Sequence, residues 1–328
     1  MKSSRIAKEN GPEAGWTTTF SVGGRLALPV LTALSIGLLG GASCKKKEST
    51  AAGDPNGVIA AADAAKQPAG PVDKTPIPGV DVSKLETSKQ DRFFQLVASL
   101  PSPCGKAHSL RTSVASDATC KRAPFAARLV AELIADEQSD DTVRGYYDQR
   151  YTKNTKVYQF KLDGAPVHGS PDAPVTLVEF FDYGCPACVQ MKPVIDQVAK
   201  ENQGKLKVVY KMYPLTSKHP DSLGAAQAAM AAHAQGKFQV MHDLVFDKFG
   251  AQKKADLRRY AEQVGLDLAR FDLDYGAQEA VVRQDMAEGE ANGVDSTPSL
   301  YLNGRRYPGP ADPKYFAMAI EEELAARQ

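Results

Sequence analysis

The sequence lacks a surplus of charge of either sign, and this absence restricts its partners. Its 40 Lys and Arg residues nearly balance its 39 Asp and Glu residues, which leaves a net charge of +1 over 328 residues. Proteins that bind nucleic acid usually concentrate Lys and Arg in a stripe or patch. The sequence has no such stripe, so we do not expect nucleic acid as a partner.

Histidine and cysteine are also scarce. His219, His233 and His242 lack the spacing of a zinc protease motif, and we expect each of them in packing or at the surface. We therefore predict no metal and no cofactor. The five cysteines are Cys44, Cys104, Cys120, Cys185 and Cys188. The first lies at a processing signal, and the other four are enough for two pairs.

No internal repeat is apparent, and the composition is otherwise that of a globular protein, with 43% hydrophobic and 24% charged residues. The length suggests about two domains.

A long uncharged and mostly apolar run, Leu26–Ser43, follows a basic lead, and the two together predict an export signal. The small residues before Cys44 resemble a lipoprotein lipobox, in which Cys44 becomes the lipidated first residue, although Gly41 departs from that pattern. The alternative is a retained transmembrane anchor, since the run is just long enough to span a bilayer. Either way, residues 1–44 are predicted to tether the chain to a membrane, on the periplasmic side of the cell envelope.

Two segments separate this tether from the rest of the chain. Residues 45–83 are rich in Ala, Gly, Pro, Asp and Lys without any helical or strand period, which predicts a disordered spacer. Residues 84–155 show helical spacing at Phe93–Leu100, at Pro124–Asp136 and, more weakly, at Val143–Tyr151. We expect a small helical subdomain that either docks a partner or second copy or covers the catalytic domain.

Cys104 and Cys120 are predicted to form a structural disulfide in this subdomain. In an oxidising compartment, a disulfide that closes a loop of this size contributes about 3 kcal/mol. The alternatives are a second redox centre and a pair of metal ligands beside His108. The disulfide is favoured because neither cysteine stands in a strand–turn–helix setting that would lower its pKa.

From residue 156 onward, strand and helix patterns alternate. Val157–Leu162 alternates polar and apolar residues and predicts an edge strand, whereas the apolar run Val175–Phe181 is typical of a strand buried on both faces. The later patterns predict a strand at Leu206–Tyr213, helices at Ser222–Gly236, Phe238–Phe249, Lys254–Val264 and Gln278–Ala291, strands on either side of Asn303–Gly304, and a last helix that begins at Asp312–Pro313.

Two cysteines stand where the buried strand passes through the turn Asp182–Gly184 into a helix at Pro186–Asn202. Cys185 lies at the first turn of that helix, where unpaired backbone N–H groups favour the thiolate. Cys188 follows one turn later on the same face, near enough to bond to Cys185. This is the geometry of a redox dithiol.

The segment Glu179–Cys188, with the sequence Glu-Phe-Phe-Asp-Tyr-Gly-Cys-Pro-Ala-Cys, resembles the active-site segment of DsbA-like thiol–disulfide oxidoreductases of the thioredoxin superfamily. Pro193 matches their helix-kinking proline, and Thr297–Pro298 resembles their Thr–cis-Pro pair. The resemblance implies an α/β, thioredoxin-like fold over residues 156–328 with an inserted helical domain at about 220–293. A small helical segment and a disordered linker precede that fold.

The resemblance also implies roles for individual residues. The catalytic residues are Cys185, Cys188, Glu179 and Pro298, and the substrate-binding residues are Thr297, Pro298, Pro186 and Ala187. Glu179 would take the proton of Cys188 as that thiol attacks a mixed disulfide. The residues themselves leave open an ion pair between Glu179 and Lys207 or Lys211, because a buried carboxylate needs a partner.

Together these features predict a membrane-tethered thiol–disulfide oxidoreductase that acts on exported proteins, more as an oxidase than as an isomerase or reductase, with a quinone-linked membrane redox partner. Pro186–Ala187 departs from the Pro-His of the strongest oxidants, which predicts a potential of roughly −270 to −120 mV, between those of thioredoxin and DsbA. Two alternatives remain on the same fold. One is a soft-metal site, which needs further ligands, and the other is a non-catalytic peptide-binding or assembly factor.

Overall fold

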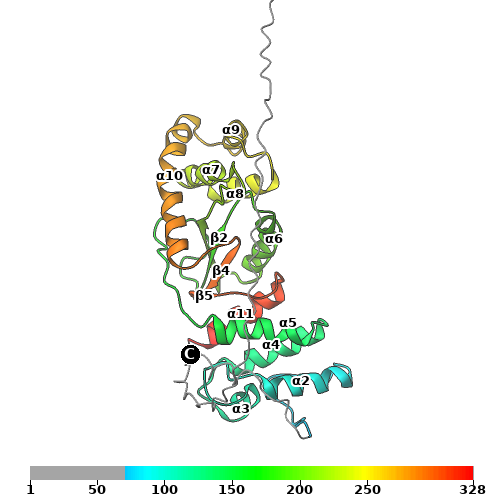
Figure 1. Cartoon of the computed structure of the whole chain (residues 1–328). Helices are drawn as coiled ribbons and strands as arrows, with labels where there is room; N and C mark the ends of the chain where they lie inside the picture. The colour runs from blue at the N-terminus through cyan, green and yellow to red at the C-terminus, as the bar shows by residue number, and fades with distance from the viewer. Residues whose placement is uncertain (1–70, 328) are drawn as a thin grey trace, which may run out of the picture. The chain divides into compact units, whose positions relative to one another are not determined.

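A computed structural model describes residues 71–327 of the protein (Figure 1). The helices are α2 (Thr87–Ser99), α3 (Leu110–Ser116), α4 (Ala123–Ala135), α5 (Asp140–Asp148), the π-helical turn η1 (Gln149–Lys153), α6 (Pro186–Glu201), α7 (Ser222–His233), α8 (Phe238–Asp247), α9 (Lys254–Gln263), α10 (Leu268–Ala291) and α11 (Pro313–Ala325). The strands are β1 (Val167–Gly169), β2 (Val175–Phe181), β3 (Leu206–Met212), β4 (Ser299–Leu302) and β5 (Arg305–Arg306). All described residues belong to one compact unit.

The strands form a five-stranded sheet in the order β1-β3-β2-β4-β5. β2 and β3 are parallel and are connected through α6, whereas β1 and β4 run antiparallel to their neighbours. Between β4 and β5, Asn303 and Gly304 have φ angles of 46° and 78°. A two-residue hairpin loop of type I′ needs positive φ at both positions, which is why Asn-Gly predicts a hairpin here. This mixed sheet places the structure in the α/β class expected from the sequence.

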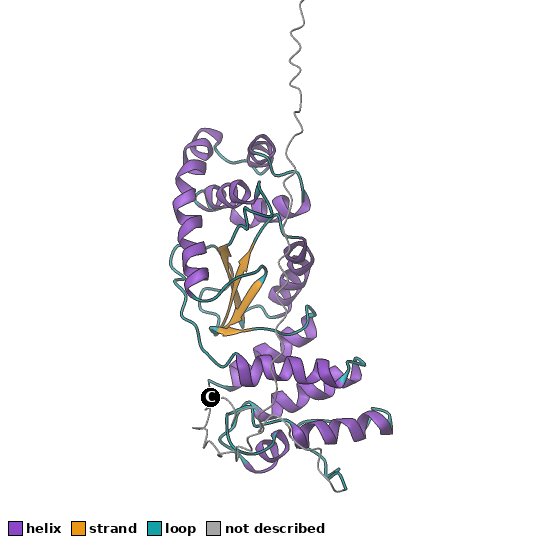
Figure 2. Ribbon diagram, in the orientation of Figure 1, coloured by secondary structure: helices purple, strands orange, loops and turns teal. Residues whose placement is uncertain are grey.

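The central strand β2 is covered on both faces, which explains its almost continuous apolar sequence. On one face, Leu177 and Phe181 join the large core that includes residues of α6 and α11. On the other face, Val178 and Phe180 join a smaller cluster that includes Tyr213 and Tyr301, and Gly289 of α10 lies against the Phe180 ring. Figure 2 shows the strands lying between α10 and α6.

Helices α7 to α10 form the insertion between β3 and β4. Six buried alanines make α7 apolar almost all round, and their small side chains let α8, α9 and α10 pack closely on it. α10 begins at Leu268 rather than at Gln278, because Asp267 caps it by accepting the Arg270 N–H at 3.0 Å. The periodic pattern missed the first part of α10, in which Phe271 is the buried residue.

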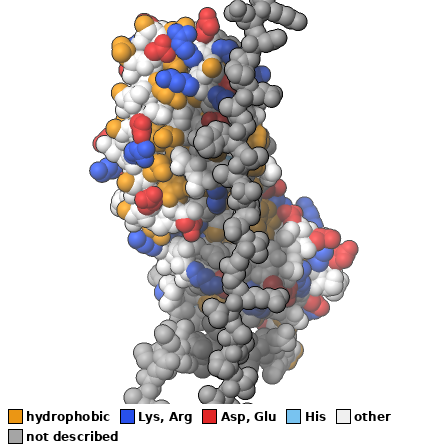
Figure 3. All heavy atoms as spheres, turned by 45° about the horizontal axis from the view of Figure 1, so that its top comes forward, with side chains coloured by type: hydrophobic (Ala, Val, Ile, Leu, Met, Phe, Trp, Pro, Cys, Tyr) orange, Lys and Arg blue, Asp and Glu red, His pale blue; other side chains and the backbone are white. Residues whose placement is uncertain are grey.

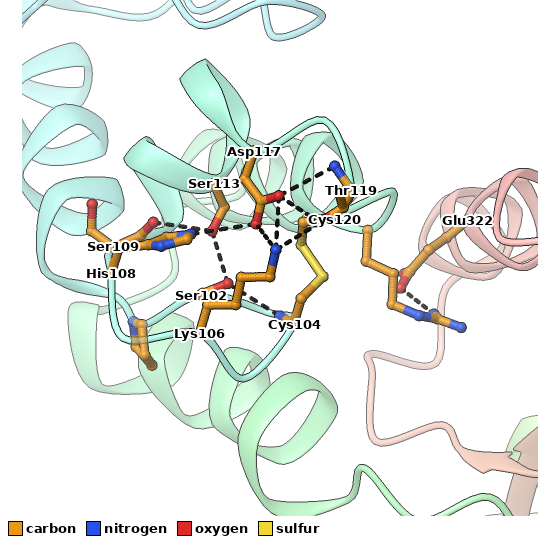
Figure 4. The surroundings of a disulfide bond; sticks show 12 residues. Ser102, Cys104, Lys106, His108, Ser109, Ser113, Asp117, Thr119, Cys120 and Glu322 are labelled. Atoms are coloured by element: carbon orange, nitrogen blue, oxygen red, sulfur yellow. Dashed lines mark hydrogen bonds and ion pairs between the residues drawn. A yellow bond between two sulfur atoms is a disulfide. The ribbon is translucent and has the colours of Figure 1, made fainter.

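The helical segment before the sheet contains the three expected helices, α2, α4 and α5, and one that the patterns missed. α3 has seven residues, too few to show a period, and begins where Ser109 accepts the Thr112 N–H. Cys104 and Cys120, predicted to form a structural disulfide, are bonded to each other with their Cα atoms 5.8 Å apart. Figure 4 shows this disulfide beside the hydrogen bonds of Lys106.

A buried carboxylate joins this helical segment to α11. The Glu322 side chain is 2% exposed, and it forms ion pairs with Arg122 and with Arg150, the latter at 2.6 Å. The Tyr151 hydroxyl also donates to Glu322 at 3.1 Å. Buried charges are tolerated when they are paired and hydrogen-bonded in this way. The helical segment and the sheet region also share one hydrophobic core, so the helices cover part of the sheet region.

Two sequence-based expectations are wrong within the described residues. Residues 71–83 are not a disordered spacer, because Ile77 and Val82 are buried in the core and Arg111 binds Asp73 at 2.7 Å. Val157–Leu162 is not a regular edge strand, since it forms a single backbone bridge, from Val157 to Arg305. Its alternating aromatic side chains pack on the smaller cluster instead of extending a ladder.

The predicted tether, residues 1–44 with Cys44, and residues 45–70 of the predicted spacer lie outside the described residues. Between residues 71 and 327, no helix combines the length and the hydropathy needed to cross a membrane. On the face drawn in Figure 3, the described Lys and Arg side chains are interspersed with Asp and Glu, in keeping with the balanced overall charge.

Candidate active site

Asp182 stabilises the turn between β2 and α6, which carries Cys185. β2 ends at Phe181, and Cys185 is the N-cap residue of α6. The Asp182 carboxylate accepts the Gly184 N–H at 2.7 Å, and the Asp182 carbonyl accepts the Cys185 N–H at 3.1 Å. An Asp side chain that bonds to the N–H two residues later is a common turn device. Pro186 then suits the first helical position, because it has no N–H to leave unpaired.

The surroundings of Cys185 favour its thiolate. Its pKa is lowered from 9.0 to about 5, chiefly by the hydrogen bond from the Cys188 thiol, against the opposing effect of burial. Hydrogen bonding by Thr297 and by the backbone N–H groups of Cys188 and Ala187 lowers this pKa further. Cys185 is 8% exposed and therefore less open than a surface helix end, but as the N-cap residue of α6 it lies where backbone N–H groups favour its thiolate.

Cys188 has the opposite environment. It is fully buried, and its sulfur accepts the Asp182 N–H at 3.5 Å. Burial first, and the hydrogen bond to Cys185 second, raise the pKa of Cys188 far above its ordinary value. The two sulfurs therefore differ in reactivity, because the thiolate is the form that attacks a disulfide and a buried thiol keeps its proton.

Glu179 lies in the middle of β2 on the face toward α6. It is 4% exposed, and burial raises its pKa from 4.5 to about 8, with Asp196 adding to the shift and Lys192 opposing it. Negative charge on Glu179 also raises the pKa of Cys188, which couples the two groups electrostatically. At neutral pH Glu179 is therefore a buried carboxylic acid that can give or take a proton.

The ion pair of Glu179 with Lys207 or Lys211 is absent from the structure. Glu179 is paired in the sheet with Tyr210, so Lys211, the next residue of β3, points to the opposite face. There Lys211 binds Asp285 at 2.9 Å and Glu288 at 3.0 Å, while the Lys207 ammonium donates to the Pro171 carbonyl.

A Glu179→Gln variant should change how stability depends on pH. Between pH 4.5 and about 8 the folded protein binds more protons at Glu179 than the unfolded chain does, so this residue makes stability fall as the pH rises. In the variant, the free energy of unfolding should therefore fall less steeply with rising pH than in the unsubstituted protein. The difference in slope should be up to about 1.4 kcal/mol per pH unit across that window. Urea unfolding at several pH values measures the effect. Glu201→Gln, at the exposed end of α6, is the control, and parallel curves for Glu179→Gln and the parent would contradict a neutral Glu179.

The remaining expected site residues surround Cys185. The Thr297–Pro298 peptide bond is cis, and the Cys185 thiol donates to the Thr297 carbonyl at 3.4 Å. The Thr297 hydroxyl is buried without a partner, which leaves it free to donate to the thiolate. Pro186 and Ala187 are exposed beside the buried sulfurs, where a bound peptide can touch them.

Sequence reasoning missed a second polar pair at this site. His219, expected in packing or at the surface, lies with its Nδ1 atom 2.7 Å from the Asp182 carboxylate. The same carboxylate accepts the Leu215 N–H at 2.8 Å. β2 and β3 are parallel neighbours, so the residues that follow them meet at one edge of the sheet. The presence of an acidic residue after β2 and a histidine after β3 is the signal that points to this pair.

Other candidate centres lie elsewhere or are not formed. Cys104 and Cys120 are bonded to each other in the helical segment, and they do not join Cys185. His108 stands 3.6 Å from Asp117 beside them. Within residues 71–327, no three or more His, Cys, Asp and Glu side chains gather in a way that could hold a metal ion.

A buried cysteine paired with a thiolate-favouring cysteine at a helix N-cap, beside a cis-proline and on a sheet of this topology, defines the class of thioredoxin-like dithiol proteins. Residues 161–322 match the family model described as Thioredoxin. The chain belongs, through this region, to the thioredoxin superfamily.

Known proteins match about half of the chain. The Na(+)/H(+) antiporter NhaA 1 of Mycobacterium sp. (strain KMS) is 37% identical over 159 residues, which are 47% of this chain and 26% of that protein. The antiporter NhaA 3 of Salinispora tropica is 36% identical over 162 residues, 49% of this chain and 25% of that protein. The match thus spans about a quarter of these curated relatives.

Solved structures also align with about half of the chain. A thioredoxin-like oxidoreductase from Silicibacter pomeroyi DSS-3 is 31% identical, with 51% of this chain and 94% of that chain covered and a TM-score of 0.46. Oxidised BdbD from Bacillus subtilis is 25% identical, with 51% and 97% covered and a TM-score of 0.46.

Proposed function

We propose that this protein is a thiol–disulfide oxidoreductase that exchanges disulfides with exported proteins through Cys185 and Cys188, acting more as an oxidase than as an isomerase or reductase. The observation that carries the proposal is the asymmetry of the two sulfurs. One has its pKa lowered to about 5 at the N-cap of α6, and the other is a fully buried thiol beside a neutral acid. A merely structural cysteine pair needs no such difference.

The chemistry starts from the oxidised Cys185–Cys188 bond. A substrate thiolate attacks the Cys185 sulfur, the bond to Cys188 breaks, and Cys188 leaves as a thiolate that takes a proton from Glu179. A second substrate thiolate then attacks the substrate sulfur of the mixed disulfide and displaces Cys185 as a stable thiolate. Two electrons pass from the substrate to the cysteine pair, and the substrate gains a disulfide. A membrane redox partner, linked to quinone, would reoxidise the pair.

The stabilised Cys185 thiolate supports the oxidase direction, because stabilising the reduced form raises the reduction potential. The exposed residue before Cys188 is Ala187, which adds no charge of its own. We therefore place the potential at roughly −270 to −120 mV, between the values for thioredoxin and DsbA.

An Ala187→His variant should raise the potential. An imidazolium at this exposed position, beside the Cys185 thiolate, would stabilise the reduced form, and an increase of about 30 mV corresponds to a tenfold shift in the equilibrium with a reference dithiol. Equilibration with glutathione followed by thiol trapping gives the potential. Ala187→Gln is the control for size, and an unchanged or lower value in Ala187→His would contradict this account.

We also propose that the protein works at the cell envelope, on the periplasmic side and held to a membrane by its N-terminal segment. The Cys104–Cys120 disulfide supports an oxidising compartment, since such bonds seldom persist in the cytosol. The apolar run Leu26–Ser43 and the cysteine that follows it support the tether. Ion antiport, which the curated relatives carry in their names, is not part of the proposal, because the match covers only a quarter of those proteins.

The test is transfer of a disulfide to a reduced peptide that carries two cysteines. The purified protein is oxidised, mixed with the peptide and quenched in acid, and mass spectrometry counts the thiols on both molecules. We expect the peptide to lose two thiols while Cys185 and Cys188 gain two. If the peptide stays reduced with the protein disulfide intact, the exchange function is wrong.

A further inference from the structure

A histidine and a buried aspartate stand at the edge of the exchange site without a part in the steps above. The Asp182 side chain is fully buried and accepts hydrogen bonds from the Gly184 N–H, the Leu215 N–H and the Nδ1 atom of His219. Since the Asp182 side chain acts as the acceptor in all its other contacts, we assign the proton of this contact to Nδ1. In the neutral ring, Nε2 is then the free acceptor.

The surroundings fix where the ring stands. The backbone of His219 is held by Ser222, which donates to its carbonyl from the N–H at 3.1 Å and from the hydroxyl at 2.8 Å. The His219 Cβ atom is so close to Gly184 that a Cβ placed at Gly184 would be 2.5 Å from it. His219 therefore packs on the residue immediately before Cys185.

One side of the ring faces an open space. The His219 side chain is 21% exposed and lines a cavity of about 150 Å³, together with Gly184, Phe249 and Gln252. The cavity wall includes Gly184, the residue before Cys185, so a molecule bound there would lie next to both the His219 ring and the turn that carries Cys185.

We propose that His219, oriented by Asp182, is the base that accepts the proton of the incoming substrate thiol. The proposal rests on the exchange function proposed above and names a group that takes part in its first step. The thiol proton passes to Nε2, the thiolate sulfur bonds to the Cys185 sulfur, and the Cys185–Cys188 bond breaks with its electron pair leaving on Cys188. The proton returns to solvent from His219 after the mixed disulfide has formed.

The other charged groups near His219 do not replace it as this base. Asp182 already accepts three hydrogen bonds, Asp221 lies in the cavity wall at the start of α7, and Lys218 precedes His219 in the chain. Cys185 itself is bonded to Cys188 in the oxidised protein that carries out this step. Among these groups, the imidazole is the one that offers a nitrogen able to accept a proton and pass it on.

The test compares two thiols with the oxidised protein and a His219→Asn variant. The Asn amide can donate to Asp182 as Nδ1 does, but it has no nitrogen at the position of Nε2. One thiol is a cysteine peptide, of which about 3% is ionised at pH 7. The other is 4-mercaptophenylacetate, an aromatic thiol that is mostly ionised at that pH and reduces disulfides. His168→Asn, on β1, is the control for loss of a histidine elsewhere.

We expect the variant to react about tenfold more slowly with the peptide and within twofold of the parent with the aromatic thiol. The ionised fraction caps the benefit of a base at roughly thirtyfold. The difference should vanish above the pKa of the peptide thiol. A second measurement needs no variant. As the pH is lowered below the pKa of the peptide thiol, the rate of the unsubstituted protein with the peptide should fall less steeply than the ionised fraction of the peptide.

Three results would overturn the proposal. Equal losses with both thiols would make His219 a residue that only positions the turn. Equal rates of parent and variant with the peptide, together with a rate that follows the thiolate fraction, would exclude a base. A parent protein that reacts with neither thiol would remove the exchange function itself, whereas the first two results leave that function standing.

Discussion

A Cys185→Ser variant should react with an aromatic disulfide at least about a thousandfold more slowly than the unsubstituted reduced protein at pH 7. With a pKa of about 5, Cys185 is almost entirely a thiolate at that pH, whereas Cys188 is fully buried and its pKa is raised. The thiolate is the attacking species, so the variant loses both the nucleophile and access to it. The release of thionitrobenzoate, followed by absorbance, gives the rate.

Two substitutions of the partner cysteine sharpen this result. Cys188→Ser keeps a hydroxyl that can donate to the Cys185 thiolate but cannot resolve a mixed disulfide, so the variant should stop with one thionitrobenzoate attached. Cys188→Ala removes the donor that contributes most to the low pKa of Cys185, and that pKa should therefore rise. The pH dependence of alkylation at Cys185 separates the two. An undiminished rate in Cys185→Ser would show that the reactive sulfur lies elsewhere.

Replacing Glu322 with Gln should cost about 3–5 kcal/mol of unfolding free energy. Glu322 is buried between Arg122 and Arg150 and accepts a hydrogen bond from Tyr151. The amide would leave the Arg150 guanidinium without a carboxylate and Arg122 with Glu323 alone, and breaking a buried ion pair from one side typically costs this much. Denaturant unfolding, followed by circular dichroism with the Cys104–Cys120 disulfide intact, measures the loss.

The neighbouring residue supplies a matched control. Glu321 binds Arg128 at 2.7 Å, but both side chains are largely open to solvent. Glu321→Gln should therefore change stability by about 1 kcal/mol or less, as exposed ion pairs usually do. Similar losses in Glu321→Gln and Glu322→Gln would mean that burial does not govern the contribution of Glu322.

The sequence was most informative where a local pattern determines a local structure. The apolar run of β2, the cysteine at the start of α6 and the Asn303–Gly304 turn all depend on neighbouring residues, and each can be recognised without knowing the fold. Cys185 and Cys188 belong to the same kind, since a turn of helix brings them together.

Features that depend on distant contacts could not be foreseen in the same way. The sequence suggests Lys207 or Lys211 of β3 as the partner of Glu179. In the sheet, Glu179 pairs with Tyr210, so both lysines point to the opposite face, and this register cannot be predicted from the sequence. The contact of Asp182 with His219 joins residues that α6 and β3 separate in the chain. Ile77 and Val82 were assigned to a spacer because single apolar residues among Pro, Gly and Asp show no period, yet the core has room for them.

The carboxylate of Glu322 also determines how the molecule comes apart. Separating the helices before β1 from α11 would leave the charges of Glu322, Arg122 and Arg150 unpaired in apolar surroundings. We therefore expect the helical segment and the sheet region to unfold together. Thermal unfolding and proteolysis of the described chain should therefore show one cooperative transition. No stable intermediate should form in which the region around Cys185 and Cys188 stays folded while the helical segment is unfolded.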